Sequence, residues 1–288
     1  MTTSASTKIL KSVVAPNLPI PTIQYSQTYS EILNNVLRLY FNQLDASLNL
    51  LSDQNGGAVL SFPNGAFHQD GTTTLTTGIT NTSTTPIVVG STAGFPSSGY
   101  FLIGSEIIKY TSTTSTTFAG TITRGALGTT NVAHTAGAAI SEVQGTGSST
   151  TIGIMQLNNT DYSSNVAINP LDITQIVFTT AGLYNIQFSA QLLSYANADD
   201  NVTIWVRQNG VDVPATGGIA TVPAIHGGIP GAIIAGWNYF LRVNSGDYLQ
   251  LCWVTDSGNS VVATFPVGTS PVHPSSPALI LTAAFVSA

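Results

Sequence analysis

The chain has 288 residues, but only 7 of them are Lys or Arg and only 13 are Asp or Glu. A net charge of -6 without a Lys/Arg cluster excludes a row of phosphate contacts, so we expect no nucleic-acid binding. We expect neither membrane insertion nor secretion, because no segment approaches the roughly 18 apolar residues of a membrane span and none resembles a signal peptide. Thr accounts for 39 residues, and with 27 Gly and 14 Pro it favours strands and turns over helices.

The N-terminal region predicts an extended arm followed by one amphipathic helix. Residues 1–24 are polar and then rich in proline, which opposes a helix. Thr28 and Glu31 fit a capping box, and Asn55-Gly56-Gly57 fits a helix end.

The predicted helix carries a wide apolar face. Apolar residues recur at spacings of three and four: Leu33, Leu37, Tyr40, Leu44, Leu48 and Leu51. Two interpretations stay open, packing on the helix's own domain or packing in an oligomer or on a partner protein. We assign residues 1–57 to an arm and an anchoring or trimerising helix, with Leu37, Leu44 and Leu51 as candidate trimer contacts.

Residues 58–85 are interpreted as a Thr/Ser-rich linker, and residues 86–145 as a small β module of about five short strands. Its clearest signal is a hairpin of Tyr100–Ile103 and Glu106–Tyr110, joined by Gly104-Ser105, where a glycine permits a type II′ turn. A module of this size is marginal alone and is expected to lean on its surroundings. Residues 145–150 are interpreted as a second flexible joint.

Residues 151–288 show the two-residue period of a sheet with one core face. Between Leu183 and Leu192 one face is apolar, whereas the other carries uncharged residues such as Gln187 and Gln191. Uncharged side chains are easier than ionic ones to cover with another subunit, which suggests burial in an oligomer.

Two further strand pairs and a terminal strand complete the prediction. Asn209-Gly210 predicts a type I′ hairpin, and residues 233–243 and 248–255 are expected to form another pair. The strand of residues 278–286 is apolar almost throughout, which predicts burial on both faces near an oligomer axis. Candidate trimer contacts of this domain are therefore Gln187, Gln191, Leu281 and Phe285.

Several stretches resemble known families. Phe178–Ser189, Trp205–Gly210 and Leu241–Leu251 are similar to a Gly-x-Tyr strand, a hairpin and a Gly-Asp strand opening of the trimeric C1q/TNF-like domain family, across about residues 151–288. The run from Gly94 through Glu106–Tyr110 to Thr129 resembles a small β module of tailed-bacteriophage structural proteins. The resemblance implies a mainly β chain with an N-terminal amphipathic helix, a small central β module and a C-terminal antiparallel jelly-roll sandwich.

The same resemblance implies a function. We expect a non-enzymatic homotrimer in a phage virion, a short tail fibre or receptor-binding appendage for host attachment, held to other virion proteins through residues 1–57. A capsid decoration or head-fibre protein is the alternative, and a spike that degrades surface polysaccharide is a less favoured one.

No catalytic or metal-binding pattern stands out. The four histidines have no ligand spacing, and pairs of acids such as Glu106 and Asp172 arise by chance in any chain. Asp199-Asp200 is interpreted as a polar turn rather than a cation site, and no cofactor is expected. The loops of residues 214–231 and 265–277 carry His226 and His273, which are candidate contacts to a host surface glycan or protein.

Overall fold

Two compact units make up the chain, one ending at Phe62 and one starting at Pro63. A computed structural model describes residues 13–21, 23–52, 62–269 and 271–287. The chain is mainly β with one N-terminal helix, and its sheets are antiparallel, which confirms the predicted fold class.

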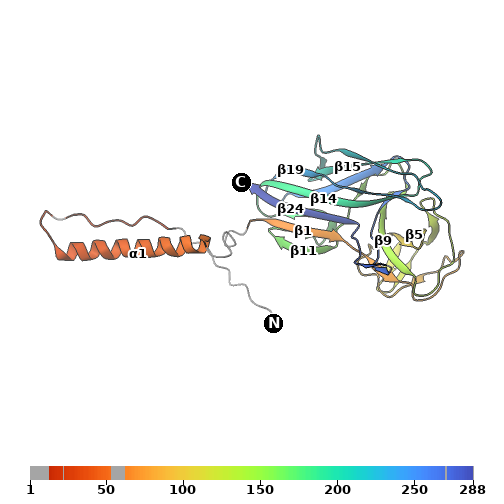
Figure 1. Ribbon diagram of the computed structural model, residues 1–288, viewed down its shortest axis with the longest axis horizontal. Helices are drawn as coiled ribbons and strands as arrows, with labels where there is room; N and C mark the ends of the chain where they lie inside the picture. Colours follow the sequence, from red (N-terminus) through yellow and green to blue (C-terminus); the bar gives the residue numbers. More distant parts are fainter. Residues whose placement is uncertain (1–12, 22, 53–61, 270, 288) are drawn as a thin grey trace. The chain divides into compact units, whose positions relative to one another are not determined.

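The first unit contains helix α1 (Gln27–Ser52) and an extended segment, residues 13–21, that Figure 1 draws running back along it. Ser26 caps the helix, since its hydroxyl oxygen accepts from the Tyr29 amide at 3.3 Å. The prediction of Thr28 as the cap is therefore wrong, although the helix lies where we expected it. Within the described residues, no helix is long and apolar enough to cross a membrane.

The second unit is built on a sandwich of two sheets (Figure 1). Strands of the first sheet follow the order β11 (Asn159–Ser164), β1 (Asn64–Gln69), β24 (Leu279–Ser287), β14 (Gly182–Ser194), with β18 (Gly231–Ala235) and β19 (Asn238–Val243) on the far side of β14. The second sheet runs β12 (Val166–Asn169), β13 (Asp172–Phe178), β20 (Tyr248–Thr255), β15 (Asp200–Gln208), β16 (Val211–Asp212), with β10 (Gly153–Ile154) on β20 and β17 (Gly218–Val222) on β15.

Neighbouring long strands of the chain lie in opposite sheets, as in a jelly roll. Strand β13 is followed by β14 in the other sheet, and β19 by β20. The predicted pairing of residues 233–243 with 248–255 is therefore wrong. The four residues between β19 and β20 carry the chain from one sheet to the other, so each strand finds its hydrogen-bond partners elsewhere.

The main core lies between the two sheets. Tyr184, Ile186 and Phe188 point into it from β14, as the two-residue period predicts. Tyr184 meets Phe178 edge to face at 4.8 Å between ring centroids, and its hydroxyl donates to the Thr180 carbonyl at 2.9 Å. The hairpin turn at Asn209-Gly210 is confirmed, because both residues have positive φ.

The central β module has more strands than we expected. One sheet holds β4 (Gly99–Ile103), β5 (Glu106–Tyr110), β8 (Thr123–Ala126) and β9 (Ala139–Gly145), with β2 (Thr72–Thr74) also on β9, and a smaller one holds β3 (Ile87–Val88), β6 (Ser112–Thr114) and β7 (Thr117–Ala119). The predicted β4–β5 hairpin is confirmed, with Gly104 at φ 60°. The rings of Phe101, Tyr110 and Phe118 pack together in the core of the module, with Phe101 stacked on Phe118 and Tyr110 tilted against both.

The module is inserted into the sandwich rather than tethered to it. Residues 64–69, which we expected in a linker, form β1 in the first sheet, so the module follows the first sandwich strand. Strand β9 pairs with β21 (Ser260–Ala263), which pairs with β14, so one sheet runs through both parts. A third apolar cluster, which includes Val143, Leu193 and Val261, fills the junction. Residues 145–150, which we expected to be a flexible joint, therefore begin at the end of β9, a strand that is paired with β4 on one side and β21 on the other.

Candidate functional site

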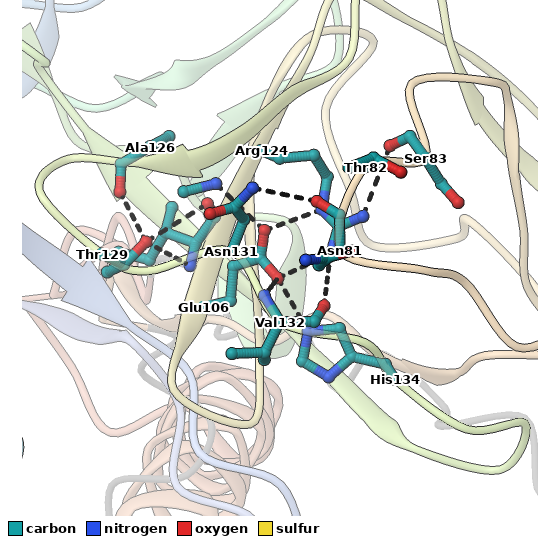
Figure 2. A network of polar contacts seen from close by, with 12 residues as sticks. Asn81, Thr82, Ser83, Glu106, Arg124, Ala126, Thr129, Asn131, Val132 and His134 are labelled. Atoms are coloured by element: carbon teal, nitrogen blue, oxygen red, sulfur yellow. Dashed lines mark hydrogen bonds and ion pairs between the residues drawn. The ribbon is translucent and has the colours of Figure 1, made fainter.

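A buried polar network lies in the module and is centred on Glu106 (Figure 2). The Arg124 guanidinium donates to both carboxylate oxygens, at 2.7 and 2.8 Å, and His134 Nε2 lies 2.8 Å from Oε2. The amides of Gly125 and Val132 also donate to the carboxylate. Glu106 is 0 % exposed, so its negative charge is compensated by protein groups and not by water.

This arrangement stabilises the fold and is unsuited to acid catalysis. Burial raises the pKa of Glu106, but the hydrogen bonds from Arg124, His134 and the two amides outweigh burial and hold the pKa below its ordinary value. Arg124 also donates to the carbonyls of Thr80, Ser83 and Val132, which fastens the Thr/Ser-rich segment to the module. A carboxylate whose pKa is lowered is ionised at neutral pH and has no proton to give to a substrate there.

The other acidic residues singled out in the sequence are equally engaged. Asp172 accepts from Thr174 and Gln175, and Asp200 accepts from the side chains of Ser257 and Ser260. Asp199 accepts from the Ala224 amide. In the part of the chain that the structure describes, no group of three or more His, Cys, Asp or Glu side chains is placed to hold a metal ion.

The outward face of the first sandwich sheet is the strongest candidate functional surface, and we call it the outer face. Strands β1, β24 and β14 contain no Asp, Glu, Lys or Arg. By contrast, the second sheet carries acids and the Arg207–Asp212 ion pair on β15 and β16. On the first sheet the ionic side chains lie on flanking strands, Asp161 on β11 and Arg242 on β19, so the absence of charge is confined to the three central strands.

Register places amides and apolar groups side by side on the outer face. Gln187 lies between Thr282 of β24 and Asn238 of β19, and Asn185 lies between Ala284 and Phe240. Large apolar side chains are exposed around these rows: Tyr162, Ile234, Phe240, Ile280 and Val286. A surface with uncharged central strands and several exposed apolar groups is typical of a contact with another protein.

Of the predicted trimer contacts, Gln187 and Gln191 do point outward, Gln187 being exposed and Gln191 half-buried. Leu281 does not, because it is 5 % exposed and belongs to the core between the sheets. Phe285 is half-buried, and its ring packs edge to face on Tyr184 inside the sandwich. Strand β24 alternates between core and surface instead of being buried on both faces, since one side of the first sheet is uncovered in a single chain.

Leu37 and Leu44 lie half-buried on α1, whereas the side chain of Leu51 lies outside the described residues. Leu48 of the predicted apolar stripe is exposed, and so are the apolar side chains of Ile32, Leu39 and Phe41 beside it. Such a helix still has apolar surface to cover, as the wide apolar face in the sequence predicts.

The two candidate receptor histidines lie in separate hairpins and are exposed. His226 sits in the turn between β17 and β18, and His273 lies in β23 (Val272–His273), which pairs with β22 (Gly268–Thr269). Both expected loops therefore contain short strands. Sequence reasoning missed Ile234, Phe240 and Ile280 as surface residues, and the signal that could have found them is their alternation with inward residues along the same strands.

Searches for relatives found that no family model and no curated protein matches this chain.

Proposed function

We propose that this chain is a non-enzymatic, homotrimeric structural protein of a tailed-bacteriophage virion, a short tail fibre or receptor-binding appendage attached through residues 1–57. The observation that carries the proposal is the outer face, which is uncharged along its three central strands and exposes Ile280 and Phe240. A monomer that stayed in water would be expected to carry ions there.

The number of subunits and the virion setting rest on the resemblances of the sandwich to C1q/TNF-like domains and of the module to phage structural proteins. The jelly-roll order of the sheets supports the first of these. The half-buried stripe of Leu33, Leu37, Tyr40 and Leu44 on α1, with spacings of four, three and four, suits a second contact between copies.

Light scattering on the purified full chain tests the assembly, with an expected mass of three times the 29.9 kDa chain. Ile280→Glu places a charge on the outer face in every copy and should yield monomers, because a buried unpaired carboxylate is costly. Ile219→Glu is the matched control, since Ile219 is exposed on β17 of the second sheet. A monomeric wild type, or equal behaviour of the two variants, contradicts the proposal.

Labelling virus particles with an antibody against the chain tests the location. Label at the tail supports the appendage. Label on the capsid shell would contradict the tail appendage and support a capsid decoration protein. Particles without label would show that the chain is not a virion protein.

A further inference from the structure

Glu142 lies where three segments of the chain cross at the junction between module and sandwich. It belongs to β9, and its amide donates to the Gly71 carbonyl at 2.7 Å. Its own carbonyl accepts from the Thr264 amide at 3.1 Å. The main chain at Glu142 therefore ties the segment after β1 to the segment after β21.

The side chain of Glu142 is 0 % exposed, and neither carboxylate oxygen has a hydrogen-bond partner. Nearby oxygens share this condition: Gln69 Oε1 and Asp70 Oδ1 are also buried without a partner. Each of these atoms is an acceptor when the acids are ionised, and none of them receives a hydrogen bond. A buried acceptor without a donor costs free energy, and an ionised one costs more.

The charges that act on Glu142 do not relieve this cost. Burial raises its pKa to about 8, and the nearby Asp70 adds to the rise. The Gln69 amide nitrogen, which donates to the Gly94 carbonyl at 3.4 Å rather than to Glu142, offsets only part of it. Tyr110 also faces the site, and its own pKa is raised by burial and by the charge of Glu142. None of the groups that shift the pKa of Glu142 is a Lys or an Arg. Protonation of Glu142 removes its negative charge and turns one carboxylate oxygen into a hydrogen-bond donor.

We propose that Glu142 is a proton switch in the junction: the folded protein holds it as the neutral acid, and loss of its proton to solvent loosens β9 from residues 69–71 and 263–265. A hollow of about 160 Å³ borders Glu142 and is lined by Gln144, Gln156 and Trp253 among others. Once the junction loosens, water from this hollow reaches the carboxylate and hydrates the charge that the closed junction cannot meet.

Stability as a function of pH is the first test. Between about pH 4.5 and pH 8 the folded state keeps a proton that the unfolded state has lost, so stability falls as pH rises. Glu142→Gln keeps the shape, removes the titration and offers an amide donor. The folded-to-unfolded ratio of the wild type should therefore fall relative to this variant by up to about tenfold per pH unit across that window. Denaturant midpoints of the full chain measure the ratio.

Amide hydrogen exchange locates the effect. Protection factors in β9 should drop from pH 6 to pH 9 in the wild type and stay level in Glu142→Gln, while β15 serves as the internal reference. Equal changes in β9 and β15, or a pH dependence that survives in Glu142→Gln, would overturn the proposal. A rise in stability on adding Ca²⁺ at pH 9 that Glu142→Gln abolishes would also overturn it, because the site would then be built for a cation.

Discussion

The side chain of Leu127 occupies the space that a side chain at Gly145 would need: a Cβ there would lie 2.8 Å from Leu127 Cδ1 and 3.4 Å from Val261 Cγ1. Leu127 has a φ of 55°, a conformation that bulky residues rarely adopt, and it packs on the junction cluster. This contact packs the turn after β8 against β9 and β21, where the module joins the sandwich.

Gly145→Ala should therefore lower the free energy of unfolding by about 1 kcal/mol, because the added methyl group forces the end of the Leu127 side chain out of its place. Gly217→Ala is the control, since a Cβ at Gly217 meets nothing within 4 Å and the residue does not have positive φ. Denaturant titration of both variants measures the difference. If the two substitutions cost the same, Leu127 does not fill the junction as described.

Leu281 and Ile280 are neighbours on β24 with opposite roles, the first in the core and the second on the outer face. Leu281→Ala should cost about 2–5 kcal/mol of stability through a cavity. Ile280→Ala should change the stability of the folded chain by about 0.5 kcal/mol or less and weaken self-association. Calorimetry and sedimentation measure the two effects separately, and a core-sized loss for Ile280→Ala would contradict its assignment to the outer face.

Removing the carboxylate at the centre of the module network leaves Arg124, whose side chain is 4 % exposed, buried without its counter-ion. Glu106→Gln should therefore cost about 3–5 kcal/mol. Asp212→Asn, which breaks the pair between the half-buried Arg207 and the exposed Asp212, is the control and should cost about 1 kcal/mol or less.

The network around Glu106 should also make the stability of the fold decrease at acid pH. The pKa of Glu106 is lowered in the folded protein, so its contribution is complete above the ordinary value of 4.5 and disappears as pH falls through the folded pKa. Unfolding midpoints of the wild type should decline on the acid side, and Glu106→Gln should flatten that part of the profile. An unchanged acid profile in the variant would show that other carboxylates control it.

Ser26→Ala should shorten or fray α1 and cost about 1 kcal/mol, because the hydroxyl that accepts from the Tyr29 amide is lost. Thr28→Ala is the matched control inside the helix and should have no such effect. Helical ellipticity of the full chain during thermal unfolding reports both, and a larger loss in Thr28→Ala would restore the capping box that the sequence suggested.

Local patterns predicted much of the architecture correctly. The alternation along Leu183–Leu192, the turn at Asn209-Gly210 and the hairpin across Gly104 all appear where the sequence places them. Each of these signals is contained in a few neighbouring residues, because the two-residue period and the turn chemistry of glycine and asparagine act locally.

The predictions that were wrong concern residues whose structure depends on contacts with distant parts of the chain. Residues 64–69 form a strand inside the sheet because β24 and β11 lie on either side of them. Their own six residues, which include Asn, Gly and Gln, do not predict a strand. Leu281 lies in a strand that is apolar almost throughout, so the sequence does not distinguish it from the exposed Ile280, and only the packing of the first sheet against the second shows that Leu281 points inward.

Sequence alone therefore determined the class of fold, the scarcity of charge and the existence of a wide apolar helix face. The tertiary structure alone decided which strands share a sheet, which uncharged strands lie at the centre of that sheet, and that the carboxylate of Glu142 lies buried without a hydrogen-bond partner. The reason is physical: periodicity and turns are properties of adjacent residues, whereas burial and charge neutralisation depend on residues that folding brings together from across the chain.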